Sequence, residues 1–149
     1  MRIFIFSVLI SLVFIFKSIA DTKYSELIEL NKSNDPIEII KLVDKLILGF
    51  EIETSFVEDC ANHLKMFKEK SNDKCAKLLD RKDSMLRLLN ILGSQNFKDN
   101  LMSLAVKIDN KTTEVISPKE LENKLELLME KQNKFNNATG TVTFLMKNL

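Results

Sequence analysis

Residues 35–67 read DPIEIIKLVDKLILGFEIETSFVEDCANHLKMF. Asp35 can cap the first free N–H groups of a helix, Pro36 suits the first helical position, and Glu38 can reach back to the cap. Apolar residues then recur in steps of three, four or seven, which predicts one long amphipathic helix. Its predicted buried stripe is Ile39, Val43, Leu46, Phe50, Val57, Cys60, Leu64 and Phe67. Glu53 interrupts the stripe, and a second capping box at Ser55 to Glu58 leaves open a break near Glu53.

Helical periodicity continues through the rest of the chain. It predicts further helices over residues 22–30, 73–92 and 96–108 and from residue 118 onward, while residues 140–149 could be a strand, a last helical turn or a frayed end. The chain has only three glycines, two prolines and no tryptophan, so little turn chemistry is left for a β-sandwich or barrel. We therefore predict an all-α, single-domain antiparallel bundle of four to five helices.

The predicted helix over residues 73–92 has a broad apolar surface and a glycine at its end. Gly93 is placed to end it as a left-handed terminator. The residues expected to be buried along this helix are Cys75, Leu78, Leu79, Met85, Leu86, Leu89 and Leu92.

The N-terminus has the pattern of a secretory signal peptide. A basic Met1-Arg2 precedes an apolar stretch from Ile3 to Phe16, and Ala20 provides a small residue at the cleavage site. A helix over this apolar stretch would span only about 21 Å, less than the roughly 30 Å hydrocarbon core of a membrane. We expect residues 1–20 to be cleaved, residues 21–149 to form the secreted helical domain, and no transmembrane segment in the mature chain.

The net charge argues against one class of partner, and the charged residues are unevenly distributed along the sequence. Without Arg2 and Lys17 of the signal peptide, the 22 basic residues of the chain become 20, against 21 acidic ones. A near-neutral surface argues against nucleic acid as a partner. Residues 21–59 hold four basic and ten acidic side chains, whereas residues 62–87 hold eight and four. This asymmetry suggests complementary surfaces within a bundle.

Cys60 and Cys75 are the only cysteines, and an even pair in an oxidising compartment is usually a disulfide. In an antiparallel hairpin the two Cα atoms approach within about 6.8 Å only if the turn is centred near Phe67 or Lys68. The disulfide therefore predicts that the first helix ends near Met66 and that the connection runs from Lys68 to Asn72.

Reactive chemistry is not expected in the same segment. His63 lies within about one helical turn of Asp59 and Cys60, but structural zinc usually takes four nitrogen or sulfur ligands and catalytic zinc three plus water. A Cys-His nucleophile needs a free thiol, and no catalytic or phosphate-binding motif is present in the sequence. We predict a non-enzymatic protein with no cofactor and no metal.

Three N-glycosylation sequons begin at Asn31, Asn110 and Asn137, each in a segment expected to be a loop. We expect modification at one or more of them in a eukaryotic source.

Two modes of action remain open for a secreted helical protein without catalytic residues. The first is binding to another macromolecule or surface in the extracellular space, with a possible interaction face at Lys74, Lys77, Arg81 and Lys82. The second is carriage of a lipid or other small apolar ligand between helices. The residues that could line such a cavity are Phe50, Phe67, Met85, Met102, Leu104 and Met129. We favour macromolecular binding, because an internal cavity costs packing and nothing in the sequence requires one.

Overall fold

The computed structural model describes residues 26–149, so the predicted signal peptide over residues 1–20 lies outside the described residues. All regular secondary structure in the described range is helical, which confirms the predicted all-α class. A helical segment covers residues 26–32. The helices that follow are α2 (Pro36–Phe67), α3 (Asp73–Asp80), α4 (Lys82–Gly93), α5 (Gln95–Asp109) and α6 (Pro118–Asn148).

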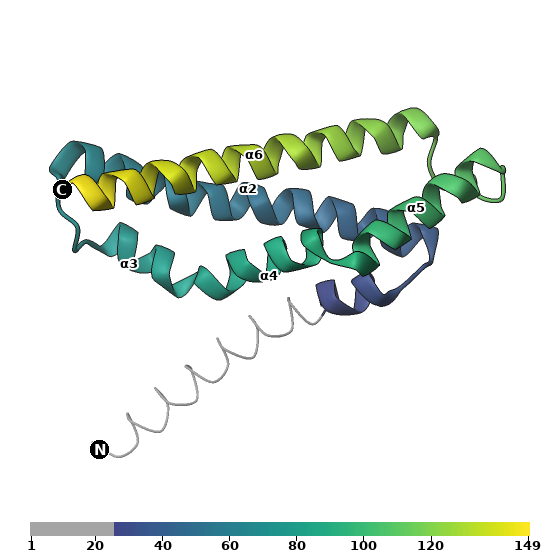
Figure 1. Cartoon of the computed structure of the whole chain (residues 1–149), viewed down its shortest axis with the longest axis horizontal. Coiled ribbons are helices and arrows are strands. Elements are labelled where there is room, and N and C mark those ends of the chain that lie inside the picture. Colours follow the sequence, from purple (N-terminus) through teal and green to yellow (C-terminus); the bar gives the residue numbers. More distant parts are fainter. Residues whose placement is uncertain (1–25) are drawn as a thin grey trace, which may run out of the picture.

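Helix α2 is the central element, and it packs against every other helix from α3 to α6 (Figure 1). Asp35 caps its start by accepting hydrogen bonds from the N–H groups of Ile37 and Glu38, as predicted. The helix is continuous through Glu53, so no break occurs there. It ends at Phe67, and the following residue, Lys68, caps it with a left-handed backbone and an N–H that donates to the Leu64 carbonyl.

The predicted buried stripe of α2 is correct except at its last position. Its members from Ile39 to Leu64 are buried, but Phe67 is 57 % exposed. Phe67 is the last residue of the helix, and its ring packs on the His63 ring at 4.7 Å between centroids instead of entering the core.

Helices α2 and α6 run in the same direction, which corrects the predicted antiparallel arrangement for this pair. Lys124 pairs with Asp44, and further along both helices Lys134 pairs with Glu58 at 3.3 Å. The residue numbers of the paired side chains increase together along the two helices, so the helices must be parallel. Figure 1 shows both helices running toward the C-terminal end of the molecule.

Helices α2 and α6 are parallel because of the junction between α4 and α5. Ser94 alone separates them, with an extended backbone (φ −71°, ψ 149°), and its side chain accepts a hydrogen bond from the Phe97 N–H. Gly93 is the last residue of α4 and has no left-handed backbone, so the predicted terminator is wrong. Helix α5 continues away from α4 without reversing beside it (Figure 1). From α2 onward the chain therefore makes three passes, and the first and third are parallel.

A second difference lies at Arg81. The sequence predicts one helix over residues 73–92, but Arg81 leaves helical geometry (φ −97°, ψ 1°) and separates α3 from α4. This turn directs the Arg81 side chain toward α2, where it forms a hydrogen-bonded ion pair with Glu53.

Helix α6 begins at the predicted residue 118, with a capping box in which Ser117 and Glu120 satisfy each other's backbone N–H groups. Both hydrogen bonds from Ser117 hold the pKa of the Glu120 carboxyl below its usual value. The helix continues to Asn148, so residues 140–149 are helical and not a strand.

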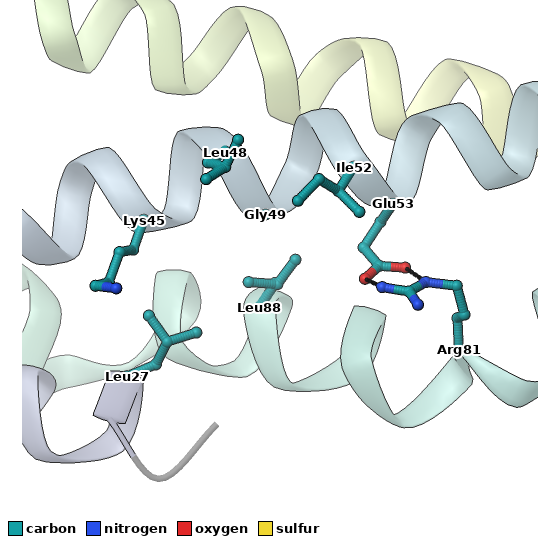
Figure 2. A pocket seen from close by; sticks show the side chains of 8 residues that line it. All are labelled: Leu27, Lys45, Leu48, Gly49, Ile52, Glu53, Arg81 and Leu88. Atoms are coloured by element: carbon teal, nitrogen blue, oxygen red, sulfur yellow. Dashed lines mark hydrogen bonds and ion pairs between the residues drawn. The ribbon is translucent and has the colours of Figure 1, made fainter. Parts of the chain in front are cut away.

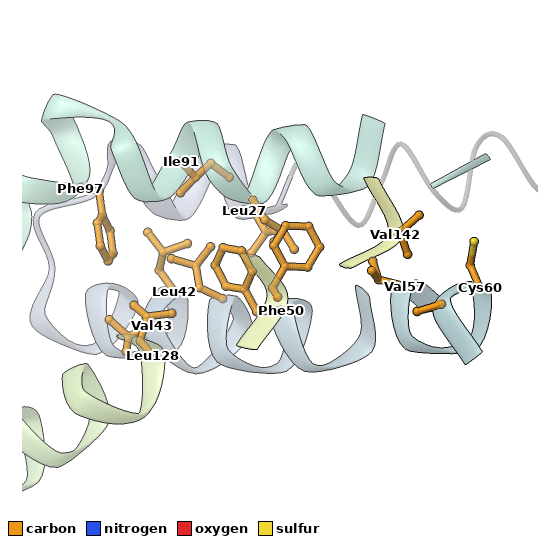
Figure 3. Close-up of a cluster of buried hydrophobic side chains, with 14 of the residues drawn as sticks. Leu27, Leu42, Val43, Phe50, Val57, Cys60, Ile91, Phe97, Leu128 and Val142 are labelled. Atoms are coloured by element: carbon orange, nitrogen blue, oxygen red, sulfur yellow. The ribbon is translucent and has the colours of Figure 1, made fainter. Parts of the chain in front are cut away.

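The main apolar core follows α2 along its length (Figure 3). Phe50 lies at its centre, fully buried, with its ring 5.6 Å from that of Phe135 on α6. A second cluster joins Ile39 of α2 to Leu104 of α5 and Leu121 of α6. Helix α2 contributes to both clusters, and α5 and α6 meet each other in the second one.

Candidate functional site: an apolar groove beside α2

The Cys60–Cys75 disulfide is present and joins α2 to α3, as predicted. The two Cα atoms are 4.7 Å apart, and the connection covers residues 68–72, where the sequence placed it. Asn72 caps α3 by accepting a hydrogen bond from the Cys75 N–H. The bridge therefore fixes α3 against the last turns of α2.

His63 takes part in no reactive cluster. Its ring is largely buried beside Phe67, and its Nε2 lies 4.0 Å from a Glu69 carboxylate oxygen. Because Cys60 is bound in the disulfide, it offers His63 no free thiol. Residues 26–149 contain no group of three or more His, Cys, Asp or Glu side chains that could hold a metal ion.

The predicted cationic face is divided by the turn at Arg81. Lys74 and Lys77 are exposed on α3, and Lys74 lies 3.9 Å from Asp59. Lys82 is exposed at the start of α4. Arg81 is not part of this surface, because its guanidinium turns inward to α2.

Figure 2 shows the ion pair that Arg81 makes with Glu53. Its Nε and Nη2 donate to the two Glu53 carboxylate oxygens at 2.8 and 2.6 Å, and the guanidinium lies 4.2 Å from the Phe56 ring centroid. Glu53 is buried, whereas the Arg81 side chain is 31 % exposed. The pair lies at the end of a pocket of about 100 Å³, next to Gly49, where a leucine side chain of α4 approaches closely.

The residues expected to line an apolar cavity do not surround a common space. Phe50 and Leu104 are fully buried in different clusters, and Met102 is 68 % exposed on α5. Phe67 and Met129 are also exposed. Only Met85 lines the larger feature described next.

An open apolar groove lies between α3–α4 on one side and the C-terminal half of α6 on the other; we call it the α4–α6 groove. Its two contiguous sections have volumes of about 650 and 310 Å³. No Cα atom of α6 lies within 8 Å of one in α3 or α4. The apolar residues that line its walls include Leu78, Leu79, Met85, Leu86, Leu89, Phe135, Val142 and Met146, and Val57 lies on its α2 floor.

The groove leaves large apolar side chains in contact with solvent. Leu79 is 75 % exposed and Leu86 is 45 % exposed, which corrects the prediction that both are buried. The sequence did contain a signal for this outcome. The apolar surface predicted for residues 73–92 includes adjacent pairs such as Leu78 with Leu79, and it is therefore wider than one helix can bury against a single neighbour.

The three sequon asparagines lie in different surroundings. Asn110 is exposed at the C-terminal end of α5 and is close to the predicted loop location. Asn137 is exposed but lies within α6, and Asn31 lies in the helical segment over residues 26–32, so these two are not in loops. The Asn31 Nδ2, the atom that would carry a glycan, donates to Ser94 Oγ at 3.1 Å.

Among the described residues, no helix has the length and apolar character needed to cross a membrane. No protein-family model, no curated protein and no solved structure matches this chain, so its candidate function rests on its own residues.

Proposed function

We propose that this chain is a secreted, non-enzymatic protein that acts by binding another macromolecule in the extracellular space, and that the α4–α6 groove is its binding surface. The observation that carries the proposal is the exposure of Leu79 and Leu86 on the wall of a continuous apolar groove. Contiguous apolar surface in contact with water is unfavourable, and in folded proteins it commonly marks a place where a partner binds.

The position of the groove supports macromolecular binding over ligand carriage. A carrier buries most of its ligand inside an enclosed cavity, whereas this groove is an open channel between helix walls. The fully buried members of the predicted lining, Phe50 and Leu104, pack against other core side chains instead of facing a space.

The Cys60–Cys75 disulfide is compatible with an extracellular location, because such bonds persist in oxidising compartments. We also propose that residues 1–20 are removed as a signal peptide and that residues 21–149 form one helical-bundle domain. N-terminal sequencing of the secreted protein should then begin at Asp21. If the source is eukaryotic, treatment with N-glycosidase should lower the mass of the secreted material; an unchanged mass contradicts glycosylation.

Native mass spectrometry of the protein purified from its own source tests the binding function. We expect a bound partner chain in the wild type, its loss in the variant Leu79→Asn, and its retention in the matched control Met102→Asn. Met102 is similarly exposed but lies on α5, away from the groove. A bound lipid in place of a partner chain would support the carrier, and equal retention by both variants would show that the groove is not the binding surface.

A further inference from the structure

Resting on the proposed function, we infer the chemistry of the partner: the α4–α6 groove binds an amphipathic α-helix with acidic residues beside its apolar face. The inference depends on the shape of the groove, on the charges that line it, and on the contrast with a second groove elsewhere in the molecule.

The shape of the groove matches a helix. Its α6 wall extends from Phe135 to Lys147, a rise of about 18 Å, which corresponds to about 12 residues of an α-helix lying alongside. Helix α2 forms the floor and α3–α4 the opposite wall, so an added helix would occupy the open position of a four-helix arrangement. Helices bound in this way present apolar residues at i, i+3, i+4 and i+7 to the groove.

The charges around the groove indicate which charge the partner should carry beside its apolar face. The charged side chains that line it are Lys70, Lys82 and Lys147, and none of them is acidic. Within the described range, no ion pair with a carboxylate involves any of these three lysines. They are therefore available to attract a negatively charged partner, and complementary charge at the rim of an interface governs encounter and selectivity.

The groove between α5 and α6 provides an internal comparison. It is also apolar at its base, but the charged residues that line it are Asp109, Glu122 and Glu126, all acidic, and of these only Glu122 is seen, within the described residues, to pair with a lysine, Lys119 at 2.8 Å. The two grooves therefore have opposite rim charges. A partner helix with acidic flanks is attracted by the α4–α6 groove and repelled by the groove between α5 and α6.

The test uses synthetic peptides and the folded chain without its signal peptide. The probe is a fluorescently labelled helical peptide of about 12 residues, with leucines at i, i+3, i+4 and i+7 and glutamates on both flanks. A second peptide carries lysines in place of the glutamates, and a third carries a central proline that breaks the helix. Binding is measured by fluorescence anisotropy at low and at high ionic strength.

We expect the glutamate peptide to bind about tenfold more tightly than the lysine peptide at low ionic strength, with a smaller difference at high salt. The combined variant Lys70→Gln, Lys82→Gln and Lys147→Gln should remove this preference. Leu79→Asn should weaken the binding of the glutamate peptide about tenfold, whereas the control Met102→Asn should not. Far-UV circular dichroism and the urea midpoint of each variant should match those of the wild type, because the substituted side chains are exposed.

Equal affinity for the glutamate and lysine peptides, equal affinity for the proline-broken peptide, or no binding of the glutamate peptide overturns the inference. The chain could instead bind phosphatidylserine vesicles and no peptide, and lose this binding in Leu79→Asn. That result would assign the groove to an anionic membrane surface and would also overturn the inference. The proposed function is judged separately. If the native partner is lost in Leu79→Asn while the glutamate peptide does not bind, the binding function stands and only the acidic helix is wrong.

Discussion

Replacing Arg81 with methionine should destabilise the fold far more than a surface substitution does. The change keeps much of the aliphatic packing but leaves the Glu53 carboxylate buried without its two guanidinium hydrogen bonds. Breaking a buried ion pair by removing one partner costs about 3–5 kcal/mol, whereas an exposed pair contributes about 0–1 kcal/mol. Because the Arg81 side chain is partly exposed and solvent screens it, we expect Arg81→Met to lower the free energy of unfolding by about 2 kcal/mol.

Urea denaturation followed by far-UV circular dichroism measures this change, provided that the slope of the transition is unaltered. The matched control is Lys74→Met on the neighbouring helix, which removes only the exposed pair with Asp59 and should cost less than about 0.5 kcal/mol. The double variant Glu53→Met and Arg81→Met should recover stability to within about 1 kcal/mol of the wild type, because no unpaired charge remains buried. If Arg81→Met costs no more than Lys74→Met, the ion pair does not hold α4 against α2.

Four further variants test other parts of the fold. Replacing both Cys60 and Cys75 with alanine should lower the free energy of unfolding by about 3 kcal/mol, because the bridge closes a loop of 15 residues; a urea midpoint equal to that of the wild type would contradict this. Gly140→Ala should raise the unfolding free energy by about 0.5–1 kcal/mol, since a Cβ there meets open space. Gly49→Ala should give an unfolding free energy at least about 1 kcal/mol lower than Gly140→Ala does, because its Cβ would meet a leucine side chain at 2.8 Å. Identical thermal shifts for the two variants would show that this crowding is relieved at no cost. Ser117→Ala should cost about 1 kcal/mol in thermal denaturation by removing the cap of α6, and an unchanged melting temperature would argue against the capping box.

Local chemistry in the sequence determined the helical class and the starts of α2 and α6. Asp35 with Pro36, and Ser117 with Glu120, satisfy free N–H groups within one helical turn, so their effect is independent of the rest of the fold. The disulfide was also predictable. Two cysteines on consecutive helices constrain where the intervening turn must lie.

The partner of Glu53 and the direction of α5 were decided only in three dimensions. Glu53 interrupts an apolar stripe, but nothing near it in the sequence identifies Arg81, 28 positions away, as its partner. A single extended residue, Ser94, sends α5 onward instead of back, and this makes α2 and α6 parallel. Periodicity gives the helices but not the angles between them, because one residue's backbone dihedrals set the direction of the whole following helix.

For the candidate site, too, the sequence determines the residue types and the tertiary structure determines their exposure. The sequence shows that Leu79 and Leu86 are apolar and share a helical segment, and on that basis both were predicted to be buried. Whether an apolar residue is buried depends on a neighbour, and in the described chain no helix fills the space between α4 and α6. Their exposure follows from the three-pass arrangement, since two walls packed on one central helix leave a fourth position open to solvent.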